Sequence, residues 1–331
     1  MSTKKSPKPA KKDQPLSEPT SHATSHPLAL IAGPTASGKS ACAIDLAQAL
    51  AKQDRNAVII NADSAQVYAD LQVLSARPSE KEMEGVEHRL FGSWDGAEAC
   101  SAADWAVRAK AEIAQCHETG AVPILVGGTG MYLKVLIEGI APIPAIEPEI
   151  REVVRAMPVE TAYAALMIED PVRAADLNPG DTQRIARALE VKRSTGVTLG
   201  DWQQAKTGGI GDEVTLHPLV MMPERQWVYD RCDARFEQML EGGAMKEVEA
   251  LLERGLSPDL PVMRAIGVPE ITAMIRDGAS REHTIAAGAQ STRQYAKRQF
   301  TWLRNQSPVD WPKLDSKNIE IGDVFASLLQ H

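Results

Sequence analysis

The sequence has few cysteines, few aromatic residues and no long apolar run. Its four cysteines, Cys42, Cys100, Cys116 and Cys232, show no C-x-x-C spacing among 331 residues. They therefore provide neither the usual pattern of a zinc site nor a disulfide framework. We expect free thiols in the reducing environment of the cytoplasm. No apolar run reaches the roughly 18 residues that a membrane-spanning helix needs, so we expect no membrane partner.

The first 26 residues, MSTKKSPKPAKKDQPLSEPTSHATSH, contain almost no apolar side chains and lack the apolar stretch of a secretory signal. We expect a disordered tail there. The tail carries five Lys against Asp13 and Glu18, a net charge of +3, so the remainder carries −8 − (+3) = −11. An acidic body does not favour nucleic-acid binding. Any such binding must depend on local groups of Arg and Lys.

The segment GPTASGKS matches the pattern G-x-x-x-x-G-K-[ST]. It follows the apolar run PLALIAG and precedes SACAIDLAQAL, which has helical apolar spacing. A strand, a glycine-rich turn and a helix N-terminus together form an anion site, where amides, a Lys and a hydroxyl surround phosphate oxygens. The predicted phosphate-binding residues are Gly33, Pro34, Thr35, Ala36, Ser37, Gly38, Lys39 and Ser40. The pattern leaves open whether the ligand is a nucleoside triphosphate or another diphosphate.

Strands and helices alternate in the first part of the chain. NAVIINADS is a second predicted strand, SAADWAVRAKAEIAQCHETG is a helix with Ser101 as its N-cap, and AVPILVGGTG is a third strand. This order predicts an α/β fold with a parallel sheet flanked by helices. Ligands of such sheets bind at the carboxyl ends of the strands. We therefore expect Gly33, Asp63 and Thr129 to converge on one crevice.

The pattern becomes wholly helical near Pro142 and returns to an apolar, strand-like run at TLHPLVMM. We interpret residues 142–208 as a helical insertion into a core formed by residues 27–141 and 209–312. Residues 1–26 and 313–331 are the expected tails. The chain is expected to be a monomer.

The strand-end carboxylate of Asp63 has three possible roles. It could act as an indirect Mg²⁺ ligand, as a general base, or as a cap of the following turn.

Two groups of positively charged side chains are also open to interpretation. Arg184 and Arg187 share a helix face with Gln183, and Arg293 lies in a cationic stripe of the last long helix. Such stripes are either solvated or in contact with phosphates.

Six motifs, in this order and spacing, resemble the tRNA dimethylallyltransferase family, also called tRNA isopentenyltransferases. They are GPTASGKS, NADSAQVY, VGGTGMYLKVL, DTQRIARALEV, RCDARFEQML and STRQYAKRQFTWLR. The resemblance covers about residues 28 to 312. It implies that the loop holds dimethylallyl diphosphate rather than ATP, with Mg²⁺ as cofactor. It also implies transfer of the dimethylallyl group to N6 of the adenosine immediately 3′ of the anticodon in the tRNA anticodon stem-loop.

The resemblance assigns roles to individual residues. Catalytic roles fall to Lys39, Asp63, Thr129 and Arg235, with Asp63 as the general base and Arg235 on the diphosphate; Ser40 is the residue directed at Mg²⁺. The flipped base is received by Asp63, Ser64, Ala65, Gln66 and Thr129. Further tRNA-contacting positions are Arg151, Gln183, Arg184, Ile185, Ala186, Arg187, Arg264, Ala265, Ile266, Gly267, Val268 and Pro269.

Two positions depart from the family pattern, and three other functions compete with it. Leu74 stands where the family has Gly, and Val268 stands where an aromatic residue is usual, which affects any stacking on tRNA. The competing functions are an adenylate isopentenyltransferase, a small-molecule kinase and a non-catalytic RNA-binding protein. The Arg pair of the insertion favours tRNA over a free nucleotide. The intact Lys39 and Asp63 favour an enzyme.

Overall fold

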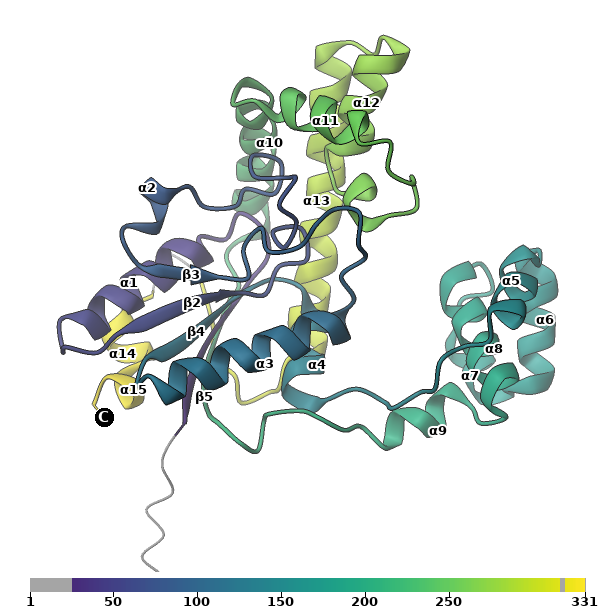
Figure 1. The fold of residues 1–331 in the computed structure, drawn as a ribbon, viewed down its shortest axis with the longest axis horizontal. Coiled ribbons are helices and arrows are strands. Elements are labelled where there is room, and N and C mark those ends of the chain that lie inside the picture. Colours follow the sequence, from purple (N-terminus) through teal and green to yellow (C-terminus); the bar gives the residue numbers. More distant parts are fainter. Residues whose placement is uncertain (1–25, 316–318, 331) are drawn as a thin grey trace, which may run out of the picture.

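A computed structural model describes residues 26–315 and 319–330 (Figure 1). Of the expected N-terminal tail, residues 1–25 lie outside this range. The strands are β1 (Pro27–Ala32), β2 (Ala57–Asn61), β3 (Glu87–Arg89), β4 (Val122–Gly127), β5 (Thr215–Met221) and β6 (Lys313–Leu314). The helices are α1 (Lys39–Ala51), α2 (Glu80–Met83), α3 (Ala102–Glu118), α4 (Gly130–Glu138), α5 (Pro148–Ala156), α6 (Val159–Glu169), α7 (Pro171–Asp176), α8 (Thr182–Thr195), α9 (Leu199–Gln204), α10 (Arg225–Glu241), α11 (Ala244–Glu253), the 3₁₀ turn η1 (Pro261–Arg264), α12 (Val268–Asp277), α13 (Arg281–Gln306), α14 (Ile321–Val324) and α15 (Ala326–Leu329).

The six strands form one sheet in the order β3-β2-β4-β1-β5-β6, and every neighbouring pair is parallel. The α/β parallel sheet that the sequence predicts is therefore confirmed. β1 lies between β4 and β5, with Ile31 opposite both Val126 and Leu219. The predicted return of the chain to the sheet at TLHPLVMM is β5.

Both faces of the sheet are covered, which explains why β1 is almost continuously apolar. Alternate side chains of β1 enter two different cores. Leu30 packs with the core that contains Trp105 of α3, while Ile31 packs with the core that contains Leu46 of α1. A helix on each side of a parallel sheet is the arrangement that the alternating sequence pattern predicts.

The third helix begins as the sequence predicts. Ser101 is the N-cap of α3, its hydroxyl accepts the amide of Asp104, and the Asp104 side chain accepts the amide of Ser101. This reciprocal capping box satisfies two amides that the helix itself leaves unpaired.

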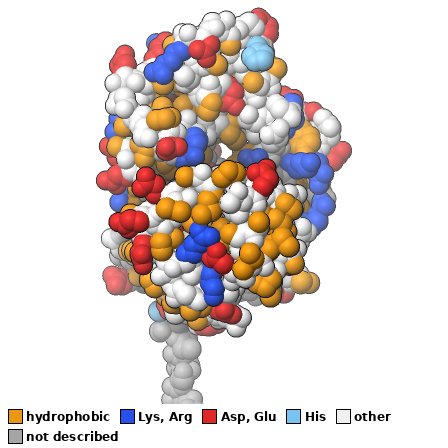
Figure 2. Space-filling view, turned by 90° about the vertical axis from the view of Figure 1, so that its right-hand side faces the viewer, with side chains coloured by type: hydrophobic (Ala, Val, Ile, Leu, Met, Phe, Trp, Pro, Cys, Tyr) orange, Lys and Arg blue, Asp and Glu red, His pale blue; other side chains and the backbone are white. Residues whose placement is uncertain are grey.

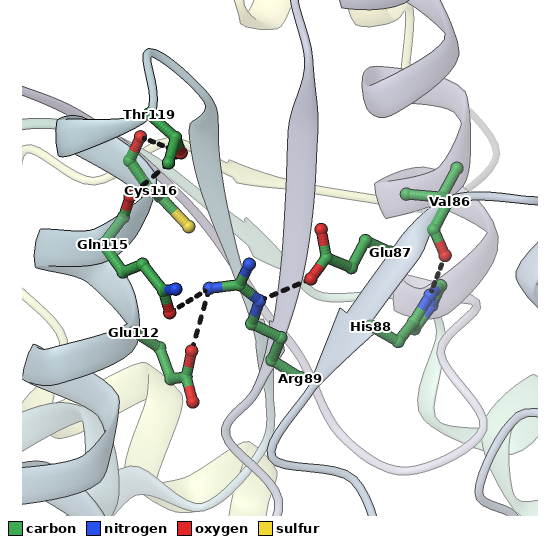
Figure 3. A network of polar contacts seen from close by, with 8 residues as sticks. All are labelled: Val86, Glu87, His88, Arg89, Glu112, Gln115, Cys116 and Thr119. Atoms are coloured by element: carbon green, nitrogen blue, oxygen red, sulfur yellow. Dashed lines mark hydrogen bonds and ion pairs between the residues drawn. The ribbon is translucent and has the colours of Figure 1, made fainter.

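The edge strand β3 is fastened to α3 through one arginine, as Figure 3 shows. The Arg89 guanidinium donates to Glu87 at 2.7 Å and to both Glu112 and Gln115 at 2.9 Å. Charged side chains on an edge strand disfavour its pairing with another chain.

The C-terminal segment differs from the predicted tail. β6 pairs with β5, and Phe325 and Leu328 are buried in the core beside α1. The sequence after residue 312 is short, and its apolar residues do not follow a helix or strand period long enough to predict a core element. The core therefore extends beyond residue 312 within the described part of the chain.

We predict that Phe325→Ala destabilises the fold by about 3–5 kcal/mol, because it removes a fully buried aromatic side chain. Chemical denaturation measures this loss. Val309→Ala is the control, since Val309 is 98% exposed and should change the free energy of unfolding by less than about 0.5 kcal/mol. An equal small effect of both substitutions would show that the C-terminal segment does not belong to the core.

Helices α5 to α9 form a separate lobe at one side of the sheet (Figure 1). The lobe has its own core, built around Leu166 of α6 and Leu189 of α8. An antiparallel bridge between Ile140 and Thr207 joins the two chain segments that connect it to the sheet. Among the described residues, no helix is long and apolar enough to cross a membrane.

Candidate functional site

The glycine-rich loop connects β1 to the N-terminus of α1. Gly38 is the N-cap of α1 and adopts a φ of 91°, a left-handed conformation that favours glycine. The amides of Gly38, Lys39 and Ser40 have no hydrogen-bond partner among the described residues. A helix N-terminus with open amides attracts an anion. The loop therefore has the geometry of a phosphate site.

Lys39 supplies the positive charge of this loop. Its side chain is buried and its Nζ donates to the Pro34 carbonyl at 3.2 Å. Burial lowers the pKa of Lys39, the Asp63 carboxylate opposes this effect, and Arg235 lowers the pKa further. An anionic ligand between Lys39 and Arg235 would favour the charged form of both side chains.

The amide of Thr35 is not open to a ligand, which differs from the expected use of the loop backbone. It donates instead to Oε1 of Gln299 on α13, at 2.7 Å. The sequence gave no sign of this contact because the two residues are 264 positions apart. Among the described residues, the amides of Ala36 and of Gly38 to Ser40 therefore have no hydrogen-bond partner, whereas those of Thr35 and Ser37 are occupied.

Three strand ends meet beside the loop, as the sequence predicts. The Gly33 amide donates to the Gly127 carbonyl at 3.2 Å, which joins the ends of β1 and β4. The Ser64 amide donates to Oγ1 of Thr129 at 2.9 Å, which joins the ends of β2 and β4. The three strand ends therefore meet at one edge of the sheet, but of Gly33, Asp63 and Thr129 only Asp63 lines the cavity described below.

Asp63 is buried at the end of β2, and its two carboxylate oxygens differ. Oδ1 accepts the amide of Ala65 at 3.0 Å, so the turn-capping role is present. Oδ2 has no hydrogen-bond partner among the described residues. The Asn61 side chain holds both the amide and the carbonyl of Asp63. The carboxylate is therefore fixed in place with one oxygen available to a substrate.

A cavity of about 630 Å³ joins the loop to these strand ends. Of the predicted residues, its walls contain Thr35, Ala36, Ser37, Gly38, Lys39, Ser40, Asp63, Ser64, Ala65, Gln66, Arg235, Arg264, Ala265 and Ile266. Polar and charged groups gather at the loop, while Leu71, Phe236 and Met239 form an apolar part of the wall. One cavity therefore presents phosphate-binding groups, a carboxylate and an apolar surface.

Other predicted residues lie outside the walls of this cavity. They are Gly33, Pro34, Thr129, Gly267, Val268, Pro269 and the residues of the insertion. Thr129 lies behind the cavity wall, where its hydroxyl contacts Ser64 and Tyr295, two residues that line the cavity. Val268 is fully buried, so its side chain packs in the core rather than offering a surface to RNA.

The departure at Leu74 adds an apolar side chain to the cavity wall. Its segment is held by Glu247, which accepts the amides of Gln72, Val73 and Leu74. The Gln66 side chain donates to the carbonyls of Ser75 and Ala76, which follow Leu74, at 3.1 Å each. The segment that was predicted to receive a base is thus joined to the Leu74 loop.

The cation pair of the insertion is exposed. The Arg184 and Arg187 side chains are 71% and 43% exposed, and they lie 3.6 Å and 3.7 Å from Asp181 and Glu190. Arg151 and Gln183 are exposed as well. Ile185 and Ala186 are buried in the core of the lobe, so their side chains are not open to RNA. Figure 2 looks onto this lobe and shows Lys and Arg side chains gathered along one rim.

Four further residues at the site were not predicted. Arg231, Tyr295 and Arg298 line the cavity, and Gln299 holds the Thr35 amide. Arg231 donates to the Ala36 carbonyl at 3.0 Å and stacks over Trp227. Burial and the charge of Asp63 raise the pKa of Tyr295, so its phenol stays protonated near neutral pH. The four-residue spacing of Tyr295 and Gln299 was the one signal that could have placed both on a single helix face.

Arg235 lies opposite the loop, on the helix that follows β5. Burial lowers the pKa of Arg235, and the neighbouring Arg231 lowers it further. Glu82 and Asp63 oppose these effects, being outweighed by burial and Arg231, so an anionic ligand beside the two arginines would further favour their charged forms. The cavity therefore favours an anionic ligand at this position.

The fold and site define an α/β protein with a glycine-rich loop at the carboxyl edge of a parallel sheet, the usual ligand position of this class. The IPP transferase family model matches residues 66–306. A tRNA dimethylallyltransferase of Erythrobacter litoralis is 63% identical over 305 residues, which cover 92% of this chain and 96% of the relative. The chain belongs to the IPP transferase family.

Solved structures agree with this placement. A tRNA isopentenylpyrophosphate transferase from Bacillus halodurans shares 30% identity and a TM-score of 0.65, covering 92% of this chain and 95% of the other. A eukaryotic dimethylallyltransferase acting on tRNA shares 27% identity and a TM-score of 0.73, covering 91% of this chain and 76% of the other.

Proposed function

We propose that the protein transfers a dimethylallyl group from dimethylallyl diphosphate to N6 of the adenosine immediately 3′ of the anticodon in tRNA. The observation that carries the proposal is the shared cavity, in which Lys39, Arg235 and the loop amides face the open oxygen of Asp63. The names of the relatives agree with this reaction. We further infer a cytoplasmic monomer.

In the proposed reaction the allylic C–O bond breaks and an N6–C bond forms. Negative charge grows on the departing diphosphate, where Lys39, Arg235 and the open amides would stabilise it. The amine is a poor nucleophile because its lone pair is delocalised into the ring. Oδ2 of Asp63 would accept its proton as the new bond forms.

We propose Mg²⁺ as the cofactor and Ser40 as the residue that would hold it. The Ser40 side chain is exposed in the cavity wall next to the open amides. The described residues contain no cluster of three or more His, Cys, Asp or Glu side chains suited to a metal ion. This fits Mg²⁺, which commonly binds substrate phosphates and water with few protein ligands. When bound, the ion would neutralise charge on the diphosphate.

The insertion is proposed to bind the tRNA backbone. Its exposed Arg151, Arg184 and Arg187 give local positive charge to an acidic protein. Adenosine must leave its stack to enter the cavity. A second contact surface at a distance from the cavity would hold the stem while the base is extruded.

We predict that Arg184→Ala combined with Arg187→Ala weakens tRNA binding and lowers its salt dependence. Each lost phosphate contact reduces the log–log slope by roughly 0.7–0.9. The Michaelis constant for dimethylallyl diphosphate should stay within threefold of wild type. Filter binding across a salt series measures the slope. Lys52→Ala, at the opposite end of α1 from the loop, is the control and should leave both values unchanged. An unchanged slope in the double variant would contradict the role of the insertion.

A comparison of donors and acceptors tests the proposed function. The protein is incubated with labelled dimethylallyl diphosphate or labelled ATP, and with unmodified tRNA, AMP or no acceptor. We expect label in tRNA from the first donor alone. Label in AMP would indicate an adenylate isopentenyltransferase, and transfer from ATP would indicate a kinase.

A further inference from the structure

Gln299 is a buried polar side chain that joins the two loops of the site. It lies on α13 and is 4% exposed. Its Oε1 accepts the Thr35 amide at 2.7 Å, and its Nε2 donates to the Gly128 carbonyl at 3.0 Å. Both ends of the amide are therefore used, and each bond has a fixed donor and acceptor.

The two partners of Gln299 belong to opposite halves of the proposed reaction. Thr35 lies in the loop that faces the diphosphate, and Gly128 directly precedes Thr129, which contacts Ser64 beside Asp63. The fit is tight, because a Cβ at Gly128 would lie 2.3 Å from Nε2 of Gln299 and 2.6 Å from the Gly33 carbonyl. The backbone at Gly128 thus approaches Gln299 as closely as only glycine permits.

One turn earlier, the same face of α13 contacts the residues beside Asp63. Tyr295 lines the cavity, and the Thr129 and Ser64 hydroxyls lower its pKa, against the larger effects of burial and Asp63. Four residues earlier still, Ser291 donates to Glu270, whose other oxygen accepts the Gly267 amide. The single helix α13 therefore contacts the glycine-rich loop, the residues Ser64 and Thr129 at the strand ends, and the segment around Gly267.

We propose that Gln299 is a positioning residue. It sets the distance between the glycine-rich loop that contains Thr35, here called the donor loop, and the turn that contains Gly128 and Thr129, here called the acceptor loop. This inference rests on the proposed prenyl transfer. Reacting atoms must be about 3–3.5 Å apart before bond formation, and a misplacement of about 1 Å can cost on the order of 100-fold in rate. A bridge with one donor and one acceptor fixes two backbone atoms at once. Its loss would leave the glycine-rich loop able to bind the diphosphate and the residues beside Asp63 able to bind the tRNA. It would disturb the alignment of these two parts of the site.

The first test replaces Gln299 with Met, which keeps the length of the side chain and removes both hydrogen bonds. We expect the single-turnover rate to fall roughly 10- to 100-fold, with the affinities for tRNA and for inorganic diphosphate within threefold of wild type. Gln294→Met is the matched control, because Gln294 is an exposed glutamine of the same helix. Rates are expressed per active site, after the fraction of active enzyme is titrated, so partial misfolding cannot imitate the effect.

The second test replaces Gln299 with Glu and uses pH. A protonated carboxyl can accept the Thr35 amide and donate to the Gly128 carbonyl, whereas a carboxylate can only accept. The rate of Gln299→Glu, divided by the wild-type rate at each pH, should be highest at acidic pH. It should fall at least fivefold as the introduced carboxyl loses its proton, a step that burial moves toward neutral pH. The other ionisable groups of the cavity wall, among them Lys39, Asp63 and Tyr295, are the same in both proteins, so the ratio isolates the effect of the introduced carboxyl.

The outcomes separate this inference from the proposed function. A pH-independent ratio for Gln299→Glu, or a wild-type rate for Gln299→Met, would overturn the positioning role. Binding of tRNA or diphosphate that weakens in parallel with the rate would also overturn it, since Gln299 would then support one part of the site. If wild type transfers no prenyl group to tRNA, the proposed function itself is wrong.

Discussion

Asp63→Asn is expected to lower the single-turnover rate of prenyl transfer by roughly 10²–10⁴-fold. The asparagine side chain keeps the shape of the carboxylate and can still accept the Ala65 amide, so the turn at the end of β2 should persist. It cannot accept the proton of the adenosine amine. Affinities for tRNA and dimethylallyl diphosphate should change less than threefold near neutral pH.

A matched control is available in the same cavity. Asp45 lies on α1 and also lines the cavity, but it follows the loop rather than ending a strand. Asp45→Asn should stay within threefold of the wild-type rate. If both substitutions had the same effect, the loss would reflect cavity charge in general, and Asp63 would not be the base.

The Asp63 substitution should also change the pH dependence of donor binding. The Asp63 carboxylate raises the pKa of Lys39 against the larger effect of burial. Without it, Lys39 should lose its proton at lower pH than in wild type. As the pH increases, the Michaelis constant for the donor should therefore begin to rise at a lower pH in the variant than in wild type.

Lys39→Ala and Arg235→Ala should each lower turnover at least 10-fold and lower donor affinity to a smaller extent. Both cations face one proposed diphosphate, whose negative charge grows as the C–O bond lengthens, so both interactions strengthen in the transition state. Because they share this ligand, the double variant should be non-additive, with a coupling of roughly 0.5–3 kcal/mol. Single-turnover rates at saturating tRNA give the double-mutant cycle.

A second cycle provides the comparison. Lys39→Ala combined with Arg184→Ala pairs the loop with the insertion, and these two residues contact different substrates in the proposed complex. Their effects should add within about 0.5 kcal/mol. Full additivity in the cycle of Lys39 with Arg235 would mean that the two do not act on the same diphosphate.

The sequence predicted those parts of the site that lie within short, periodic segments. The loop around Lys39 and the strand ends at Asp63 and Thr129 follow from apolar runs that stop at a glycine or a polar residue. Parallel strands bring such ends to one edge, so their convergence could be predicted without knowing any long-range contact. Arg235 was assigned through the family resemblance of the motif RCDARFEQML, and the structure places it on α10, the helix after β5.

The remaining parts depend on contacts between distant segments, which local patterns do not contain. Gln299 occupies the Thr35 amide from α13, and Phe325 enters the core from a short C-terminal segment. Ile185 and Ala186 were grouped with their cationic neighbours as tRNA-contacting, although their helix turns them into the core of the lobe. Each difference arises from tertiary packing that overrides the local sequence context.

The most direct test determines where in the RNA the transferred group is found and whether its transfer requires the 6-amino group of adenosine. An anticodon stem-loop with adenosine immediately 3′ of the anticodon is incubated with the protein and dimethylallyl diphosphate, then digested to nucleosides and examined by mass spectrometry. A second stem-loop carries inosine there, which lacks the 6-amino group. We predict one dimethylallyl group per RNA, on that adenosine alone, and none on the inosine RNA. Modification of another nucleoside, or none in either RNA, would contradict the account.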